Sequence, residues 1–245
     1  MNQIYSSILQ NKTQNRKMLA VLVDPDKCCS THFDTLTKLL KAHTPDFIFI
    51  GGSQLKIPFT DLIQQFKTRL DIPIVLFPGD ATQFSANADA LLFLSLLSGR
   101  NAEYLIGQHV KAALAIKKSG LELIPTGYIL IDGGRHSAVE YISNTHPIPA
   151  DRIEIAVSTA LAGEMLGMKA IYLEAGSGAN QAIAAPTIEF VKSHISIPLI
   201  VGGGIRTDHQ LFSAFEAGAD LVVIGNILET EPDRIEGFIK IKNQF

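Results

Sequence analysis

The sequence predicts a (β/α)8 barrel of the TIM type, and three observations lead to this fold class. The chain has 245 residues, which is close to the usual size of one such barrel. Short runs of nearly continuous apolar residues alternate with amphipathic stretches, as expected for parallel strands buried on both faces and the helices between them. Eight such runs occur, and eight parallel strands imply closure into a barrel. We therefore expect residues 1–245 to form a single domain.

The eight runs are rich in Val, Ile, Leu and Phe and contain few charged residues. Since they show little alternation of apolar and polar residues, both faces of each strand should be buried. The expected strands are Leu19–Val23, Phe47–Ile50, Ile74–Phe77, Ala90–Leu94, Glu122–Tyr128, Ala170–Glu174, Leu199–Val201 and Leu221–Ile224.

Amphipathic stretches lie between most of these runs, and several have recognisable ends. Ser30 and Asp208 are the expected N-caps of two helices, because their side-chain oxygens can accept backbone N–H groups. Gly120 and Gly218 are the expected stops of two helices, because glycine readily adopts a left-handed conformation. The expected helices are Ser30–Lys41, Phe59–Arg69, Glu103–Lys118, Ser158–Leu166, Thr187–Ser193, Asp208–Ala217 and Asp233–Lys242.

Two connections break this alternation. Residues 79–89 are too few for a normal helix, so we expect an irregular third helix in the barrel. Residues 129–151 form a long connection that contains Gly133-Gly134-Arg135-His136, which is typical of a lid or a substrate loop.

The composition argues against several classes of protein. The net charge is −3 and Lys and Arg form no block, which disfavours nucleic-acid binding. No segment resembles the apolar core of a signal peptide or is long enough to span a bilayer, so we expect no stable membrane anchor. Cys28 and Cys29 are adjacent, which suits neither a structural disulfide nor a zinc site, so we expect a cytoplasmic protein.

Three strand ends in the last third of the chain carry glycines. They are Tyr172–Gly178, Val201–Ile205 and Ile224–Asn226. In a closed parallel barrel these consecutive ends meet at one rim. Glycine lets backbone N–H groups approach an anion closely, and the helix N-termini that follow add positive potential. The sequence therefore predicts a phosphate-binding site at this rim.

Glu174 lies beside this predicted phosphate site. Tyr172 and Glu174 alternate along one strand, so their side chains should share a face. The carboxylate could accept a proton from a substrate hydroxyl, and Tyr172 could hydrogen-bond the same substrate. The alternative is a strand-end glutamate that is paired with a lysine.

Polar residues also follow the first two strands. Asp24, Asp26 and Lys27 share the loop after the first strand, and Ser53 follows the second. Hard oxygen ligands suit Mg²⁺, so this rim could hold Mg²⁺ and a diphosphate. The alternatives are a solvent-exposed capping loop for the acids and an ordinary helix N-cap for Ser53.

The ordered set of strand-end motifs resembles that of the geranylgeranylglyceryl phosphate synthase family, which includes the bacterial heptaprenylglyceryl phosphate synthases. The motifs are Val23–Lys27, Ile50–Ser53, Phe77–Gly79, Leu173–Gly178, Val201–Ile205 and Ile224–Asn226. The resemblance extends over nearly the whole chain and is greatest to the archaeal-type subgroup. Some bacterial members carry a lysine two residues before the first aspartate. This chain has Leu22 there, which leaves Lys27 as a candidate cation for the phosphates.

The resemblance implies a reaction and the residues for it. In the family, sn-glycerol 1-phosphate attacks C1 of a prenyl diphosphate and diphosphate leaves, with Mg²⁺ present. The resemblance implies that Asp24 and Ser53 hold Mg²⁺. It also implies that Glu174 accepts the proton of the attacking hydroxyl, with Tyr172 beside it. The implied ligands of sn-glycerol 1-phosphate are Tyr172, Leu173, Glu174, Ala175, Gly176, Ser177, Gly178, Gly203, Gly204, Gly225 and Asn226.

The prenyl chain of such a donor needs a dry groove. The candidate groove residues, on the third to fifth strands, are Leu76, Phe77, Phe93, Leu94 and Tyr128. Geranylgeranyl diphosphate, the commonest donor in the family, is the expected donor. Because family members are dimers or larger, we also expect a homo-oligomer.

Two other classes of function stay open from the residues alone. Another phosphate-binding barrel enzyme, such as a sugar-phosphate isomerase or an FMN oxidoreductase, would share the glycine-rich strand ends. An isomerase would more often show an acid and base pair at opposite strand ends, and a flavin enzyme would be yellow. A non-catalytic barrel that binds a phosphometabolite would need neither Glu174 nor Asp24.

Overall fold

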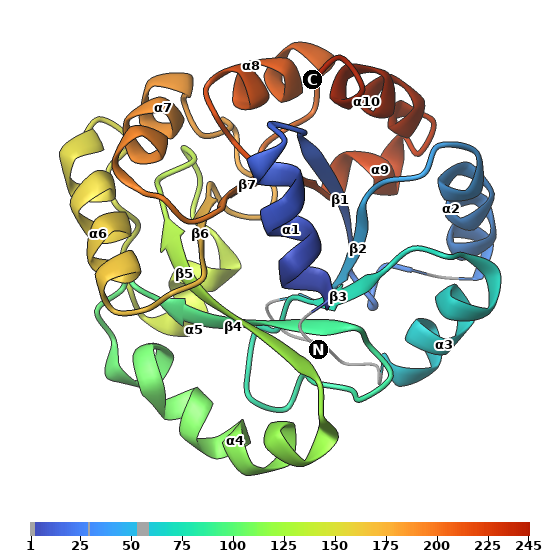
Figure 1. Cartoon of the computed structure of the whole chain (residues 1–245), viewed down its shortest axis with the longest axis horizontal. Coiled ribbons are helices and arrows are strands. Elements are labelled where there is room, and N and C mark those ends of the chain that lie inside the picture. Colours follow the sequence, from blue (N-terminus) through green and yellow to red (C-terminus); the bar gives the residue numbers. More distant parts are fainter. Residues whose placement is uncertain (1–2, 29, 53–58) are drawn as a thin grey trace.

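A computed structural model describes residues 3–28, 30–52 and 59–245 of the chain. In this described part, eight parallel strands pair in chain order, and β1 also pairs with β8, which closes the barrel. The predicted (β/α)8 fold is therefore confirmed, and Figure 1 shows the barrel surrounded by its helices. The strands are β1 (Met18–Val23), β2 (Phe47–Ile50), β3 (Ile74–Leu76), β4 (Ala90–Leu96), β5 (Glu122–Leu130), β6 (Ala170–Glu174), β7 (Leu199–Gly202) and β8 (Leu221–Ile224).

Each helix expected from the sequence is present, with bounds that differ by a few residues. The stretch expected as one helix at 103–118 is a π-helical turn followed by an α-helix. The helices are α1 (Gln3–Thr13), α2 (Ser30–Ala42), α3 (Thr60–Arg69), η1 (Glu103–Gly107), α4 (Gln108–Ser119), α5 (Ala138–Ser143), α6 (Ile153–Met165), α7 (Ala185–His194), α8 (Asp208–Glu216), α9 (Asn226–Thr230) and α10 (Arg234–Lys242). None of these described helices is long and apolar enough to cross a membrane.

The structure corrects two of the expected helix starts. Asp208 is the first residue of α8, and the N-cap is Thr207, whose hydroxyl accepts the N–H of Gln210 at 3.2 Å. The Gln210 side chain accepts the N–H of Thr207 in return, so the two residues form a capping box. Ser30 is likewise the first helical residue of α2 rather than a cap. Gly120 ends α4 in the left-handed conformation, as expected.

Helix α1 was not expected, because its sequence is polar and only Ile4 and Ile8 mark a buried face. These two side chains pack on the barrel interior beside Met18. The carboxylate of Glu122, at the start of β5, accepts the N–H groups of Ile4 at 2.9 Å and Tyr5 at 2.7 Å. Helix α1 therefore lies across the N-terminal end of the barrel (Figure 1), which leaves the C-terminal rim as the open end.

Residues 77–89 connect β3 to β4 without a helix, which agrees with the short spacing. This connection consists of turns. In one of them, the Asp80 carboxylate accepts the N–H of Thr82 at 2.6 Å. The Gln83 amide oxygen similarly accepts the N–H of Gly79 at 2.8 Å. No helix follows β3 in this connection, and Ala81 and Phe84 of these turns pack against the outer apolar layer instead.

Side chains of each strand divide between two apolar layers. One layer fills the barrel interior, and the other packs between the strands and the surrounding helices. On β6, Tyr172 points into the barrel whereas Leu173 points into the outer layer. On β3, Leu76 also belongs to the outer layer, so it faces the helices and not the barrel mouth.

Candidate active site

Glu174 ends β6 at the open rim of the barrel, where it is only 6% exposed. Its Oε1 accepts the N–H of Gly176 at 2.7 Å. Burial raises the pKa of Glu174 to about 7, although the Gly176 N–H and the Tyr172 hydroxyl oppose the rise. No lysine lies within ion-pair distance of this carboxylate in the described part of the chain, so the lysine-paired alternative is not borne out. A carboxylate with a pKa near neutrality is suited to act as a general base.

Tyr172 lies two residues before Glu174 on β6 and is fully buried. Its ring stacks on Phe77, with centroids 5.2 Å apart, and lies 5.4 Å from the ring of Tyr128. A Cβ on Gly202 would lie only 2.2 Å from the Tyr172 hydroxyl, so glycine is required at that position. Burial holds the pKa of Tyr172 well above its usual range, so its hydroxyl stays protonated as a hydrogen-bond donor.

The three glycine-bearing strand ends meet beside Glu174. Gly176 and Gly178 after β6, and Gly203 and Gly204 after β7, all have positive φ angles, which glycine adopts without strain. The described residues provide no acceptor for several of the N–H groups at these strand ends. These free donors belong to Ser177, Gly178, Gly203, Gly204, Gly225 and Asn226. Such converging N–H donors form a binding site for an anion, which we call the cradle.

Further contacts join the strand ends of the cradle. The Ser177 hydroxyl donates to Asn226 Oδ1 at 3.3 Å, which connects the end of β6 to that of β8. Leu173 and Ala175 were expected to bind substrate, but their side chains pack in the outer apolar layer. The N–H of Ala175 also donates to the Gly202 carbonyl at 3.0 Å. The structure therefore brings the other expected residues of the cradle together but leaves these two side chains outside it.

Asp24 directly follows β1 on the same rim, and its side chain is 26% exposed. Its Oδ1 accepts the N–H of Asp26 at 3.1 Å, and its Oδ2 lies 3.6 Å from Lys27 Nζ. Lys27 also pairs with Glu229 at 3.1 Å. The other expected metal ligand, Ser53, lies outside the described residues. Within those residues, no cluster of three or more His, Cys, Asp or Glu side chains could enclose a metal.

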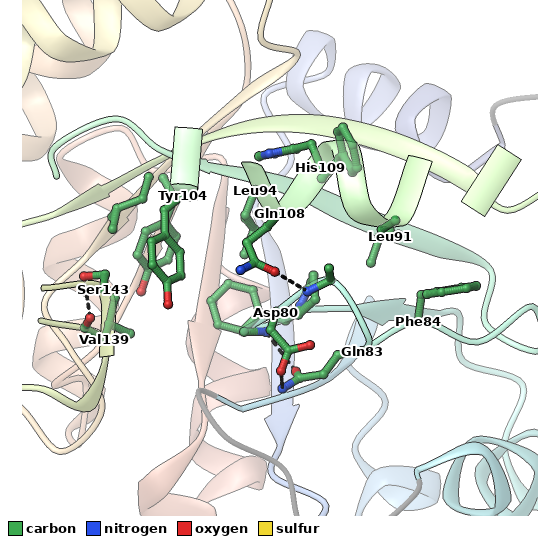
Figure 2. A pocket seen from close by; sticks show the side chains of 18 of the residues that line it. Asp80, Gln83, Phe84, Leu91, Leu94, Tyr104, Gln108, His109, Val139 and Ser143 are labelled. Atoms are coloured by element: carbon green, nitrogen blue, oxygen red, sulfur yellow. Dashed lines mark hydrogen bonds between the residues drawn. The ribbon is translucent and has the colours of Figure 1, made fainter. Parts of the chain in front are cut away.

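An apolar cavity of about 120 Å³, partly open to solvent, extends from the barrel mouth along β4 to α4. Figure 2 shows Gln108 of α4 near the Asp80–Phe84 turns, His109 farther from them, and Val139 and Ser143 of α5 on another side. Four of the expected groove residues line this cavity, and Leu76 does not, because it faces the outer layer. The four are Phe77, Phe93, Leu94 and Tyr128.

Several other lining residues were not identified from the sequence. Phe84 lies in the helix-free connection, Ala112 and Ile116 lie on the inner face of α4, and Val139 and Ile142 come from α5. The sequence signals near these residues were the apolar ends of the third to fifth strands and the short connection at 79–89, where a missing helix leaves space beside β4.

His109 places one polar ring in the cavity wall. Its Nε2 lies 3.2 Å from the Ser95 hydroxyl, and its ring meets the Phe93 ring edge-on at 4.4 Å. Burial lowers the pKa of His109, so the ring is neutral near pH 7. A neutral imidazole adds no positive charge to this apolar part of the wall, which suits a hydrocarbon ligand.

The sequence profile of the PcrB family matches residues 11–242 of the chain. The chain belongs to the PcrB family. The Chitinophaga pinensis geranylgeranylglyceryl phosphate synthase is 52% identical over 236 residues, which cover 96% of this chain and 94% of that protein. The Thermococcus kodakarensis geranylgeranylglyceryl phosphate synthase is 38% identical, over 90% of this chain and 88% of that protein.

A solved structure of the same kind of protein extends this family likeness to three dimensions. The (S)-3-O-geranylgeranylglyceryl phosphate synthase of Thermoplasma acidophilum, in complex with sn-glycerol-1-phosphate, superposes with a TM-score of 0.91. It is 32% identical and covers 99% of both chains. The PcrB family thus has archaeal and bacterial members, and this chain carries the same barrel.

Proposed function

We propose that this PcrB-family chain is a prenyltransferase that joins sn-glycerol 1-phosphate to a prenyl diphosphate. The product is a prenylglyceryl phosphate ether, and diphosphate is released. One observation carries the proposal: Glu174 lies between an anion cradle and an apolar cavity, and the rings of Tyr172, Phe77 and Tyr128 connect the two. The named relatives and the glycerol phosphate complex of the Thermoplasma protein support the same substrates.

The cradle orients the nucleophile of the proposed reaction. Its N–H groups hold the phosphate, so one of the two free hydroxyls of the glycerol, the one at the end away from the phosphate, reaches Glu174. The hydroxyl oxygen forms a bond to C1 of the donor while the bond from C1 to the diphosphate oxygen breaks. The electron pair of that bond leaves with diphosphate, and the hydroxyl proton moves to the Glu174 carboxylate.

The aromatic cluster faces the place where C1 of the donor must lie. Phe77 and Tyr128 line the apolar cavity, and both contact Tyr172 beside Glu174. Ring faces attract cations, so these rings would stabilise positive charge that develops on C1. The Tyr172 hydroxyl, which stays protonated, donates its proton toward Glu174, and its oxygen can accept a hydrogen bond from the bound glycerol.

Asp24 is the described residue that would hold Mg²⁺, and its surroundings fit this ion. Mg²⁺ commonly takes one or two carboxylates together with substrate phosphates, so a single partly exposed carboxylate on the rim suits it. When bound, Mg²⁺ would offset charge on the leaving diphosphate. Lys27, which lies 3.6 Å from this carboxylate and 3.1 Å from Glu229, is a described cation beside the same group.

We expect Asp24→Asn to raise the Mg²⁺ concentration needed for half-maximal activity by roughly tenfold or more, because a neutral amide is a weaker ligand. Activity measured across a Mg²⁺ series gives this value. Asp151→Asn, which removes a charge from an exposed aspartate, is the matched control. An unchanged Mg²⁺ series for Asp24→Asn would show that Asp24 is not a ligand.

The direct test incubates the protein with Mg²⁺, labelled sn-glycerol 1-phosphate and a series of prenyl diphosphates. We expect label in the organic phase, with none when EDTA is present, and geranylgeranyl diphosphate as the preferred donor. A folded protein that binds sn-glycerol 1-phosphate but yields no ether with any donor would overturn the proposed function.

We also propose that the chain forms a homo-oligomer, because large apolar side chains are exposed on its outer helices. Ile106, Val110 and Leu114 follow one another on the outer face of η1 and α4. Clusters of exposed apolar side chains are typical of interfaces. Sedimentation should give a mass of at least twice 26.6 kDa, and a monomer at micromolar concentration would contradict the proposal.

A further inference from the structure

Arg135 lies in the loop between β5 and α5, and this loop is fastened to the cradle. The Gly133 carbonyl accepts the N–H groups of Asn180 at 2.9 Å and Gln181 at 3.1 Å. The Asn180 side chain donates to the Gly134 carbonyl at 2.7 Å. Three hydrogen bonds therefore hold the loop on the segment that follows β6.

The two segments are also in close contact. A Cβ on Gly133 would lie 2.3 Å from the Ala175 carbonyl oxygen, so only glycine fits there. On the other side, a Cβ on Gly176 would lie 3.0 Å from the Cβ of Ser137, which caps α5. Arg135 stands between these two contact points, so the fold fixes its backbone beside the cradle.

The guanidinium of Arg135 reaches the cradle itself. Its Nη1 lies 3.6 Å from the point that a Cβ on Gly178 would occupy, and Asn226 Nδ2 lies 4.0 Å from the same point. No carboxylate lies within ion-pair distance of Arg135 in the described ranges. A guanidinium beside free N–H donors, without an anionic partner, is the arrangement that binds a phosphate.

Two other cations near the rim are already engaged. Arg206 donates from Nη2 to the Ala179 carbonyl at 2.6 Å, so it supports the loop after β6 from the other side. Lys27 pairs with Glu229 and lies beside Asp24. Of these three cations in the described part of the chain, Arg135 alone has neither a carboxylate nor a carbonyl partner, so it is available to the phosphate in the cradle.

We propose that Arg135 binds the phosphate of sn-glycerol 1-phosphate and supplies the positive charge that the neutral N–H groups of the cradle lack. This inference rests on the proposed function for the identity of the ligand. The forked guanidinium can donate two parallel hydrogen bonds to phosphate oxygens, which fixes the orientation of the nucleophile as well as its affinity.

The test compares Arg135→Gln with Arg16→Gln, an exposed arginine that precedes β1 at the opposite end of the barrel. Titration calorimetry with sn-glycerol 1-phosphate should show a Kd raised roughly 10- to 100-fold for Arg135→Gln and unchanged for Arg16→Gln. Arg135→Lys should lie between wild type and Arg135→Gln, because it keeps the charge and loses the fork. In turnover, KM for sn-glycerol 1-phosphate should rise while KM for the prenyl donor stays constant.

The outcomes separate this inference from the proposed function. Ether formation by Arg135→Gln with an unchanged Kd and KM for sn-glycerol 1-phosphate would overturn the role of Arg135 and leave the prenyltransferase standing. A weakened Kd in Arg135→Gln, when wild type makes no ether, would support the phosphate contact and overturn the reaction. Thermal unfolding of each variant checks that the fold is retained.

Discussion

Glu174→Gln is expected to lower turnover by a factor of roughly 10² to 10⁴, because an amide cannot accept the proton of the attacking hydroxyl. Binding of sn-glycerol 1-phosphate should change much less. The Gln side chain is nearly the same size, and its Oε1 can still accept the Gly176 N–H that wild-type Glu174 accepts at 2.7 Å. A large loss in kcat with a small change in Kd is the signature of a missing base.

The same variant should be more stable than wild type at alkaline pH. Burial raises the pKa of Glu174 from 4.5 to about 7, so the folded chain holds this proton more tightly than the unfolded chain. The stabilisation from Glu174 is therefore fully present below pH 4.5 and is lost as the pH rises through 7. Since Gln stays neutral, the variant should exceed wild type by up to about 3 kcal/mol in free energy of unfolding near pH 8.

Denaturant unfolding at pH 4.5 and pH 8, with pH–rate profiles, measures both effects. For wild type, kcat/KM should rise with pH with a midpoint near 7, because the base must be deprotonated in the free enzyme. Glu189→Gln, which changes an exposed glutamate on α7, should match wild type in activity. Full turnover by Glu174→Gln would exclude Glu174 as the base.

The barrel could be predicted from the sequence because its strands are buried on both faces. Such strands, for example β2 and β8, are uninterrupted apolar runs, and their order along the chain is their order around the barrel. Helix α1 was not predicted, because its contacts with the barrel come from two isoleucines and from the carboxylate of Glu122. Glu122 lies 117 residues after Tyr5 and 118 after Ile4 in the sequence.

The residues of the site that lie at the ends of individual strands could also be predicted from the sequence. Alternation along β6 places Tyr172 on the barrel side, and glycine patterns mark the cradle. The prediction that Leu76 lines the groove was wrong, because a run of apolar residues does not show which face of the strand meets the barrel interior. Arg135 was noted only as part of a long connection. Its place beside the cradle depends on hydrogen bonds to Asn180 and Gln181.

The full lining of the cavity could not be derived from the sequence, although four residues of the predicted groove belong to it. A normal helix between β3 and β4 would fill the space that Phe84 and Leu91 now border. Its other walls come from segments whose packing only the folded chain defines, including α5. A short connection in a barrel sequence therefore indicates where a long apolar ligand can enter, but not which side chains it meets.

Gly203→Ala is expected to destabilise the fold and to disable both the cradle and the base. At Gly203 the backbone has a φ of 82°, which an alanine adopts only with strain. The new Cβ would lie 2.3 Å from Glu174 Oε1 and 2.9 Å from the N atoms of Ala175 and Gly176. Strain and overlap together should cost about 2–4 kcal/mol in free energy of unfolding, and kcat/KM should fall at least roughly 100-fold.

Gly120→Ala separates the two causes of this effect. Gly120 ends α4 with a φ of 70°, close to that of Gly203, but a Cβ there would meet no atom within 4 Å. This control should therefore show the backbone strain alone, about 1 kcal/mol, with wild-type turnover. Denaturant unfolding and steady-state kinetics of both variants make the comparison. If Gly203→Ala loses no more activity than Gly120→Ala, the close packing of Gly203 on Glu174 does not shape the active site. If it does lose more, the glycines that form the cradle also hold the catalytic carboxylate in place, because Gly203 leaves the space that the Glu174 side chain occupies.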